Sequence, residues 1–172
     1  MGVCAMNQLV AVPEVDVIAS LLSAILDRQV KAEIAAPMDL RSQATRVYGV
    51  YRDAELLMTC VCVLDLPLSV YAAGALLAFP ACTINDALRT GAIEEGLFDA
   101  VREVLNICAQ MFKDCGHKVL EQVHIDSDAL PDDARAVLRS PMGRIDLSVS
   151  IMGSGSGKMS DLVDKDTTRI NR

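Results

Sequence analysis

The order in which helical and strand-like hydrophobic patterns follow one another constrains the fold of this chain most strongly. Apolar residues that recur every three or four positions predict helices, and apolar residues that alternate with polar ones predict strands. The expected elements are, in order, a helix over 13–27, a strand over 30–36, a hairpin of strands over 46–52 and 56–64, helices over 68–79 and 94–113, and strands over 118–125 and 144–152. This order lacks a strand–helix–strand alternation, so it predicts an α+β fold with an antiparallel-rich sheet and helices segregated to one side.

The remaining segments complete this outline. Residues 56–64 (LLMTCVCVL) are almost wholly apolar, which predicts a strand in the centre of the sheet. Residues 83–91 are expected to form a connection or a short helix, and residues 126–139 a loop whose latter part can be helical. Residues 153–158 (GSGSGK) open a polar end that we expect to be flexible. The expected organisation is an N-terminal extension (1–12), one domain (13–152) and a flexible C-terminal tail (153–172).

The amino-acid composition limits both the core and the partners of the chain. Apolar residues make up 52% of the chain and aromatic residues only 3%, so the core must be aliphatic, with Met and Cys filling gaps. The net charge of −7, the lack of a Lys/Arg run and the scarcity of aromatic residues argue against nucleic-acid binding. The longest apolar stretch, 66–80, is too short to span a bilayer. Because no targeting segment is recognisable, we expect a cytoplasmic protein that does not enter a membrane.

The cysteine, histidine and glycine patterns do not match known metal or nucleotide motifs. No CxxC pair occurs, and His117 and His124 do not have the spacing of a zinc site, so we expect buried free thiols and no metal in this chain. His124 alternates with apolar neighbours and should point into solvent. The segment GSGSGK fails as a P-loop because Met152 and Met159 replace its first Gly and its Ser/Thr. The acidic residues within 126–133 lack the Gly and Glu of a calcium loop, so a solvated loop is expected.

The helix expected over 94–113 carries the residues that are best placed for chemistry. At about 100° per residue, its apolar side chains fall on one broad face that suits a core. Four polar side chains fall together on the opposite face, within about 60° of one another. They are Asp99, Glu103, Asn106 and Gln110. Arg102 flanks this polar stripe.

Glu103 and Asn106 lie three residues apart, so their side chains point to the same side from adjacent turns. A carboxamide has both a donor and an acceptor, so Asn106 can hold a water molecule in line with a phosphoryl bond, as a glutamine does in GTPases. Glu103 can bind a lysine of a partner protein. Hydrolysis of an acyl phosphate needs little covalent help, so such positioning can suffice. The opposing interpretation is that any amphipathic surface helix turns polar residues toward solvent.

The spacing Asp99-x3-Glu103-x2-Asn106, followed at a distance by Pro131, resembles the active-site motif of the CheC/CheX/FliY family of chemotaxis phosphatases. The resemblance covers residues 13–152 and implies helices packed on a curved, antiparallel-rich sheet. It implies a hydrolase that removes the aspartyl phosphate of a CheY-type response regulator in chemotaxis or related two-component signalling. In that function Glu103 would contact the regulator and Asn106 would orient the water. Magnesium would be bound by the regulator, so no cofactor is expected in this chain.

The resemblance is to the CheX type, which has a single motif. The opening helix offers Asp16, Ser20 and Ser23 at the matching spacing, without the Glu or Asn of a second motif. Members of the CheX type are usually homodimers joined through their sheets, so we expect a homodimer here.

Some residues depart from the family pattern. Gln110 stands where the family often has a glycine, and Arg102 could compete as an ion-pair partner of Glu103. Twenty-four residues separate Asn106 from Pro131, slightly more than in the family. These departures support an alternative function as a non-catalytic adaptor that binds a response regulator, and a structural subunit of a larger assembly is a third interpretation. The residues expected to contact the partner around the catalytic pair are Asp99, Arg102 and Gln110.

Overall fold

The computed structural model describes residues 12–54 and 59–164. Its elements are, in chain order, α1 (Val15–Leu26), β1 (Val30–Ile34), β2 (Arg46–Arg52), β3 (Thr59–Asp65), α2 (Leu66–Leu77), α3 (Ala81–Thr90), α4 (Glu95–Cys108), the 3-10 helix η1 (Ala109–Cys115), β4 (Val119–His124), the 3-10 helix η2 (Ser127–Ala129), α5 (Asp132–Arg139), β5 (Gly143–Ile151) and β6 (Gly155–Val163). The expected N-terminal extension, apart from its last residue, the end of the expected hairpin turn and the first three residues of the strand expected over 56–64 lie outside the described residues.

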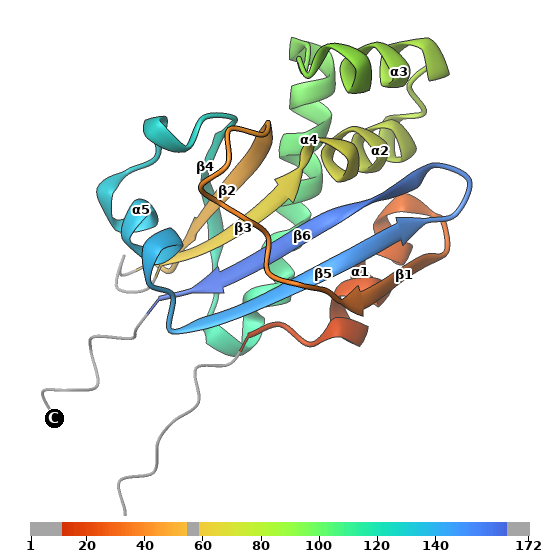
Figure 1. Ribbon diagram of the computed structural model, residues 1–172. Coiled ribbons are helices and arrows are strands. Elements are labelled where there is room, and N and C mark those ends of the chain that lie inside the picture. Colours follow the sequence, from red (N-terminus) through yellow and green to blue (C-terminus); the bar gives the residue numbers. More distant parts are fainter. Residues whose placement is uncertain (1–11, 55–58, 165–172) are drawn as a thin grey trace, which may run out of the picture.

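Within the described residues, six strands form one sheet in the order β1-β5-β6-β3-β2-β4 (Figure 1). Every neighbouring pair in this sheet is antiparallel. β3 lies in the interior of the sheet, where Val61 has Val50 of β2 on one side and Leu162 of β6 on the other. The antiparallel α+β fold and the interior position of the apolar strand, both expected from the sequence, are confirmed.

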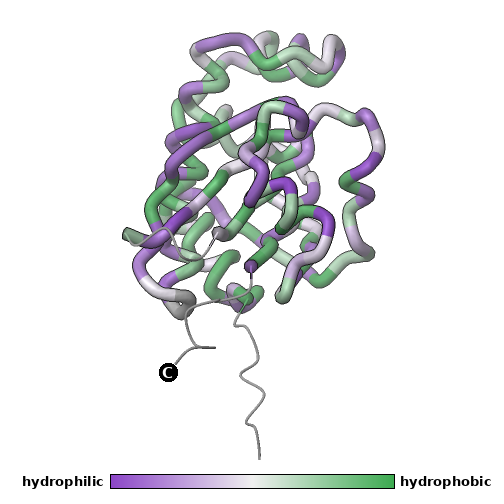
Figure 2. The backbone as a smooth tube through the Cα atoms, turned by 90° about the vertical axis from the view of Figure 1, so that its left-hand side faces the viewer, coloured by the Kyte–Doolittle hydropathy of each residue, from purple (hydrophilic) through white to green (hydrophobic). Residues whose placement is uncertain are grey.

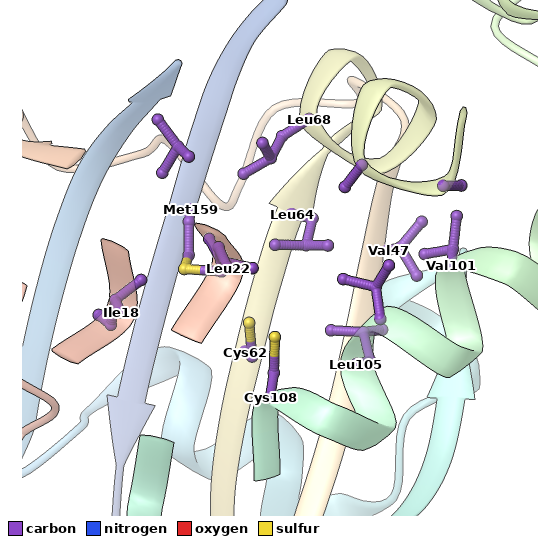
Figure 3. Close-up of a cluster of buried hydrophobic side chains, with 14 of the residues drawn as sticks. Ile18, Leu22, Val47, Cys62, Leu64, Leu68, Val101, Leu105, Cys108 and Met159 are labelled. Atoms are coloured by element: carbon purple, nitrogen blue, oxygen red, sulfur yellow. The ribbon is translucent and has the colours of Figure 1, made fainter. Parts of the chain in front are cut away.

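Helices cover both faces of the sheet. Buried side chains of α1, α2 and α4 meet those of β2, β3 and β6 on one face (Figure 3). α5 packs on the other face against β3 and β6, and α3 packs on α2 (Figure 1). The expectation that the helices lie on one side is therefore wrong for α5. Its short amphipathic pattern shows that one side of the helix is buried, but not which face of the sheet it covers.

The core is aliphatic and contains free thiols, as the composition predicts. Figure 3 shows the side chains of Cys62 on β3 and Cys108 on α4 beside one another in the core. These two and Cys60 are free and buried, whereas Cys82, which is also free, is exposed on α3. Figure 2 shows hydrophobic and hydrophilic residues interchanging along the chain, as expected for elements that each bury one side. In the described part of the chain, no helix has both the length and the apolar character needed to cross a membrane.

The C-terminal part of the domain differs most from the sequence-based expectation. Residues 153–172 were expected to be a flexible tail, but β6 lies inside the sheet between β5 and β3. A Cβ atom on Gly157 would lie 2.4 Å from the backbone nitrogen of Leu68, and one on Gly155 would lie 2.4 Å from the Tyr71 ring. The glycines therefore allow β6 to pass closely beneath α2. A Gly/Ser-rich composition is shared by flexible linkers and by strands that pass close to another element, so the composition alone did not predict this strand. Residues 165–172 lie outside the described residues.

α4 is held against the sheet near its C-terminal end. The hydroxyl group of Tyr51 on β2 donates a 2.7 Å hydrogen bond to the carbonyl oxygen of Leu105. The Tyr51 ring also lies 5.0 Å, between centroids, from the ring of Phe112. The helix expected over 94–113 is divided, because α4 ends at Cys108 and the chain continues as η1. These contacts fix the orientation of α4 and hence of its outer face.

Candidate functional site

The polar stripe of α4 faces solvent, as its helical spacing predicts. Asp99, Glu103 and Asn106 on α4 are exposed, and so is Gln110 at the start of η1. The opposite side of α4 is buried in the core, through Leu97, Ala100, Val101, Val104, Leu105 and Cys108. Because the buried side is fixed by packing, the orientation of the stripe follows directly from the period of the helix.

A groove separates this stripe from β4, which is an edge strand of the sheet. The first part of the groove encloses about 430 Å³, and α4 lines it with Arg102, Glu103 and Asn106. The facing wall is formed by successive residues of β4, namely Leu120, Glu121, Gln122, Val123 and His124. Glu103 and Asn106 therefore share one groove as well as one helix face.

The groove continues past Asn106 toward η1. This second part encloses about 590 Å³ and shares Asn106 and Leu120 with the first part. Its other lining residues are Ala109, Gln110, Lys113, His117, Lys118 and Val119. We call the two parts together the α4–β4 groove, and Asn106 lies at their junction.

Ion pairs hold the β4 wall of the groove in place. Arg52 of β2 pairs with Glu121 of β4, and its Nη2 lies 2.8 Å from Oδ2 of Asp133 on α5. The side chain of Lys118, just before β4, is fully buried, and its Nζ lies 3.2 Å from Oδ2 of Asp53. β4 is thus anchored by charged contacts as well as by its ladder to β2.

Sequence reasoning missed the contribution of β4. His124 was expected to point into solvent, but it is half-buried and lines the groove, with Nε2 2.8 Å from Oε1 of Gln122. The register of β4 on β2 shifts between Val50 and Tyr51, so Leu120 pairs with Tyr51 on the α4 side of the sheet, whereas Gln122 and His124 pair with Val50 and Tyr48 of the cluster on the α5 side. Neither this register shift nor the position of α4 beside β4 could be predicted from the alternation of residues in the sequence.

The structure separates some residues that the sequence grouped with the motif. Asp99 is exposed but lines neither part of the groove. Arg102 does line it, with its guanidinium carbon 5.4 Å from the centroid of the Phe98 ring, and within the described part of the chain it forms no ion pair with Glu103. The expected competition by Arg102 is therefore wrong. Pro131 caps α5 on the other face of the sheet and does not line the groove.

The chemistry of the groove is that of recognition and positioning. Glu103 offers a carboxylate, and Asn106 offers an amide donor and acceptor. Among the described residues, no group of three or more His, Cys, Asp or Glu side chains is arranged to hold a metal ion. Because both side chains are exposed, a reacting group would be shielded from bulk water only after a partner covered the groove. This arrangement suits a macromolecular substrate.

Comparisons with known proteins relate the chain to others by fold. No protein-family model matches the chain, and no curated protein is similar to it in sequence. Its fold resembles a chain of the FliM–SpeE complex from H. pylori, with a TM-score of 0.58 and 11% identity over 87% of this chain and 81% of that chain. The FliM middle domain from Vibrio alginolyticus has a TM-score of 0.55 and 10% identity over 85% of each chain.

A chain of the CheX–CheY complex from Borrelia burgdorferi, with bound BeF3 and magnesium, has a TM-score of 0.48 and 11% identity over 85% of this chain and 92% of that chain. Similar solved structures also include FliY and a CheC-like protein. At these identities the likeness is one of fold alone. The architecture that the resemblance implied, helices packed on an antiparallel sheet, is confirmed by the structure itself.

Proposed function

We propose that this chain hydrolyses the aspartyl phosphate of a CheY-type response regulator, with Glu103 and Asn106 as its catalytic pair. The observation that supports this proposal most directly is their common position. Both side chains are exposed, come from adjacent turns of α4 and line the same groove. The resemblance of the Asp99-x3-Glu103-x2-Asn106 spacing to the phosphatase motif supplies the reaction.

In this proposal the chain contributes positioning. The carboxylate of Glu103 binds a cationic side chain of the regulator and brings the phosphorylated aspartate over the groove. The carboxamide of Asn106 holds a water molecule in line with the bond to be broken. The water oxygen bonds to phosphorus, the bond from phosphorus to the aspartyl oxygen breaks, and the aspartate leaves as a carboxylate while the water proton passes to phosphate or solvent. Magnesium is expected on the regulator.

The surrounding residues fit a docking role. Arg102 borders the catalytic end of the groove and Gln110 lies in its second part, so both can contact a bound regulator. Asp99 lies outside the groove and would contact only a partner that extends along α4. His124 and Gln122, already joined to one another, offer polar groups on the facing wall.

A second candidate function is a non-catalytic adaptor that binds a response regulator through the same groove. Gln110, which is bulkier than the residue common in the family, lines the groove next to the catalytic pair and favours this alternative. The FliM–SpeE complex, which has a similar chain, is an example of this fold engaged with another protein. The homodimer and the cytoplasmic location stay predictions, and sedimentation of the purified chain measures the first.

The experiment that tests the proposed function measures phosphate release from an aspartyl-phosphorylated CheY-type regulator. Asn106→Ala should lower turnover about 100-fold, because the attacking water loses its orientation. Asn85→Ala is the matched control, since Asn85 is an exposed asparagine on α3, outside the groove. Equal turnover by Asn106→Ala and the wild type would exclude the proposed catalysis. Binding without turnover by the wild type would establish the adaptor.

A further inference from the structure

The second part of the α4–β4 groove is basic, although the chain as a whole carries a net charge of −7. Three residues that line it are Lys113, His117 and Lys118, and among the described residues that line it none is acidic. The first part, in contrast, contains Glu103 and Glu121 as well as Arg102, and Glu121 is paired with Arg52. The groove is therefore electrostatically polarised along its length.

Lys113 is the basic residue that is best placed to meet a partner. Lys118 is buried and forms an ion pair with Asp53, so a bound partner cannot reach its ammonium group. Lys113 and His117 are both exposed, and within the described part of the chain neither forms an ion pair. An exposed ammonium in the second part of the groove, where the described lining contains no carboxylate, favours an acidic ligand.

The edge of β4 provides a second, independent feature at the same place. β4 is the last strand of the sheet, and among the described residues no strand pairs with the side of β4 that faces away from β2 (Figure 1). Val119, which begins β4 and lines the second part of the groove, is 53% exposed. An open strand edge presents backbone donors and acceptors to which an extended peptide can add.

We infer that an extended, carboxylate-bearing segment of a partner protein adds to the edge of β4 and places its acidic side chains at Lys113 and His117. The backbone ladder supplies affinity, and the basic end of the groove selects acidic side chains and one direction for the segment. The carboxylate of Glu103, which forms no ion pair among the described residues, disfavours the reversed direction. The inference rests on the proposed function only in taking the response regulator as the protein that contributes the segment.

The test uses the full chain and a fluorescein-labelled peptide of alternating Glu and Thr residues, with binding followed by fluorescence anisotropy. Lys113→Glu should weaken binding at least about tenfold, because it reverses the charge that meets the peptide. Lys31→Glu is the matched control, since Lys31 is an exposed lysine on β1, the edge strand at the opposite side of the sheet. Circular dichroism verifies that both variants fold. Equal binding by Lys113→Glu and the wild type, or equal weakening by Lys31→Glu, overturns the inference.

Two further peptides test the mode of binding. A peptide with Lys in place of Glu should not bind at the groove, since Lys113 would repel it. An acidic peptide N-methylated at alternate residues cannot complete a backbone ladder and should bind about tenfold more weakly. Undiminished binding of the methylated peptide would exclude strand addition. None of these measurements requires turnover, so a failure here, with Asn106→Ala still inactive, removes the inference and leaves the proposed function standing.

Discussion

The substitution Asp161→Asn should remove most of the pH dependence of stability near neutrality. Asp161 lies on β6 between Cys62 of β3 and Ile145 of β5, and its side chain is completely buried. Neither carboxylate oxygen has a hydrogen-bond partner of ordinary geometry among the described residues. Burial raises the pKa of Asp161 to about 7, the neighbouring Cys62 thiol lowers it in part, and the charge of Asp146 raises it further.

The expected magnitude follows from this shift. The pKa of Asp161 rises from 3.8 to about 7, so the folded protein keeps the proton over a range in which the unfolded chain has released it. The free energy of unfolding therefore falls as the pH rises from about 4, and it levels off above about 7. The full effect is about 4 kcal/mol, of which about 2 kcal/mol lies between pH ~5.5 and pH ~8.5.

Urea unfolding followed by circular dichroism at these two pH values measures the effect. Asparagine has nearly the same shape as aspartate and no charge. Between the two pH values the free energy of unfolding of Asp161→Asn should therefore fall by about 2 kcal/mol less than that of the wild type. Asp16→Asn, which removes an exposed carboxylate on α1, should keep the wild-type dependence. Parallel pH profiles for the wild type and Asp161→Asn would refute the reasoning, because they would mean that this carboxyl group does not titrate in the folded protein.

Three further substitutions test the packing of the fold. Gly157→Ala should destabilise the fold by about 1–3 kcal/mol, because the new methyl group meets the backbone of Leu68. Gly96→Ala on α4, where nothing lies within 4 Å, should instead stabilise it by up to about 1 kcal/mol, and thermal unfolding distinguishes the two signs. Tyr51→Phe should cost about 1–2 kcal/mol, measured by urea unfolding, since it removes the 2.7 Å hydrogen bond to the carbonyl oxygen of Leu105. An unchanged stability of Tyr51→Phe would mean that this bond does not hold α4 in place.

Local periodicity was sufficient to predict much of the fold and half of the candidate site. The spacing of α4 alone placed Glu103 and Asn106 on one exposed face, because a buried helix side determines the orientation of the other side. The hairpin of β2 and β3 followed in the same way from alternation and from an apolar run. In both cases the signal lies within one element.

Features that depend on two distant elements could not be predicted. Gly155 and Gly157 lie in a segment with the composition of a linker. Their close contacts with Tyr71 and Leu68 of α2 become apparent only in the folded structure. His124 was expected to be solvated because the pattern of a single strand does not show that residues of α4, distant in the sequence, line the same groove. The face of the sheet that α5 covers depends likewise on connections and not on its own residues.

The position of β6 has a consequence for how the protein is made. Among the described strands β6 comes last in the sequence, yet it joins the β1–β5 ladder to the ladder of β3, β2 and β4. A ribosome that has released the chain only as far as Ile151 has therefore delivered two separate half-sheets, each with an open side. We expect the complete sheet to form late in synthesis, in a single folding step. In that step β6 pairs with β5 and β3 at the same time and packs beneath α2.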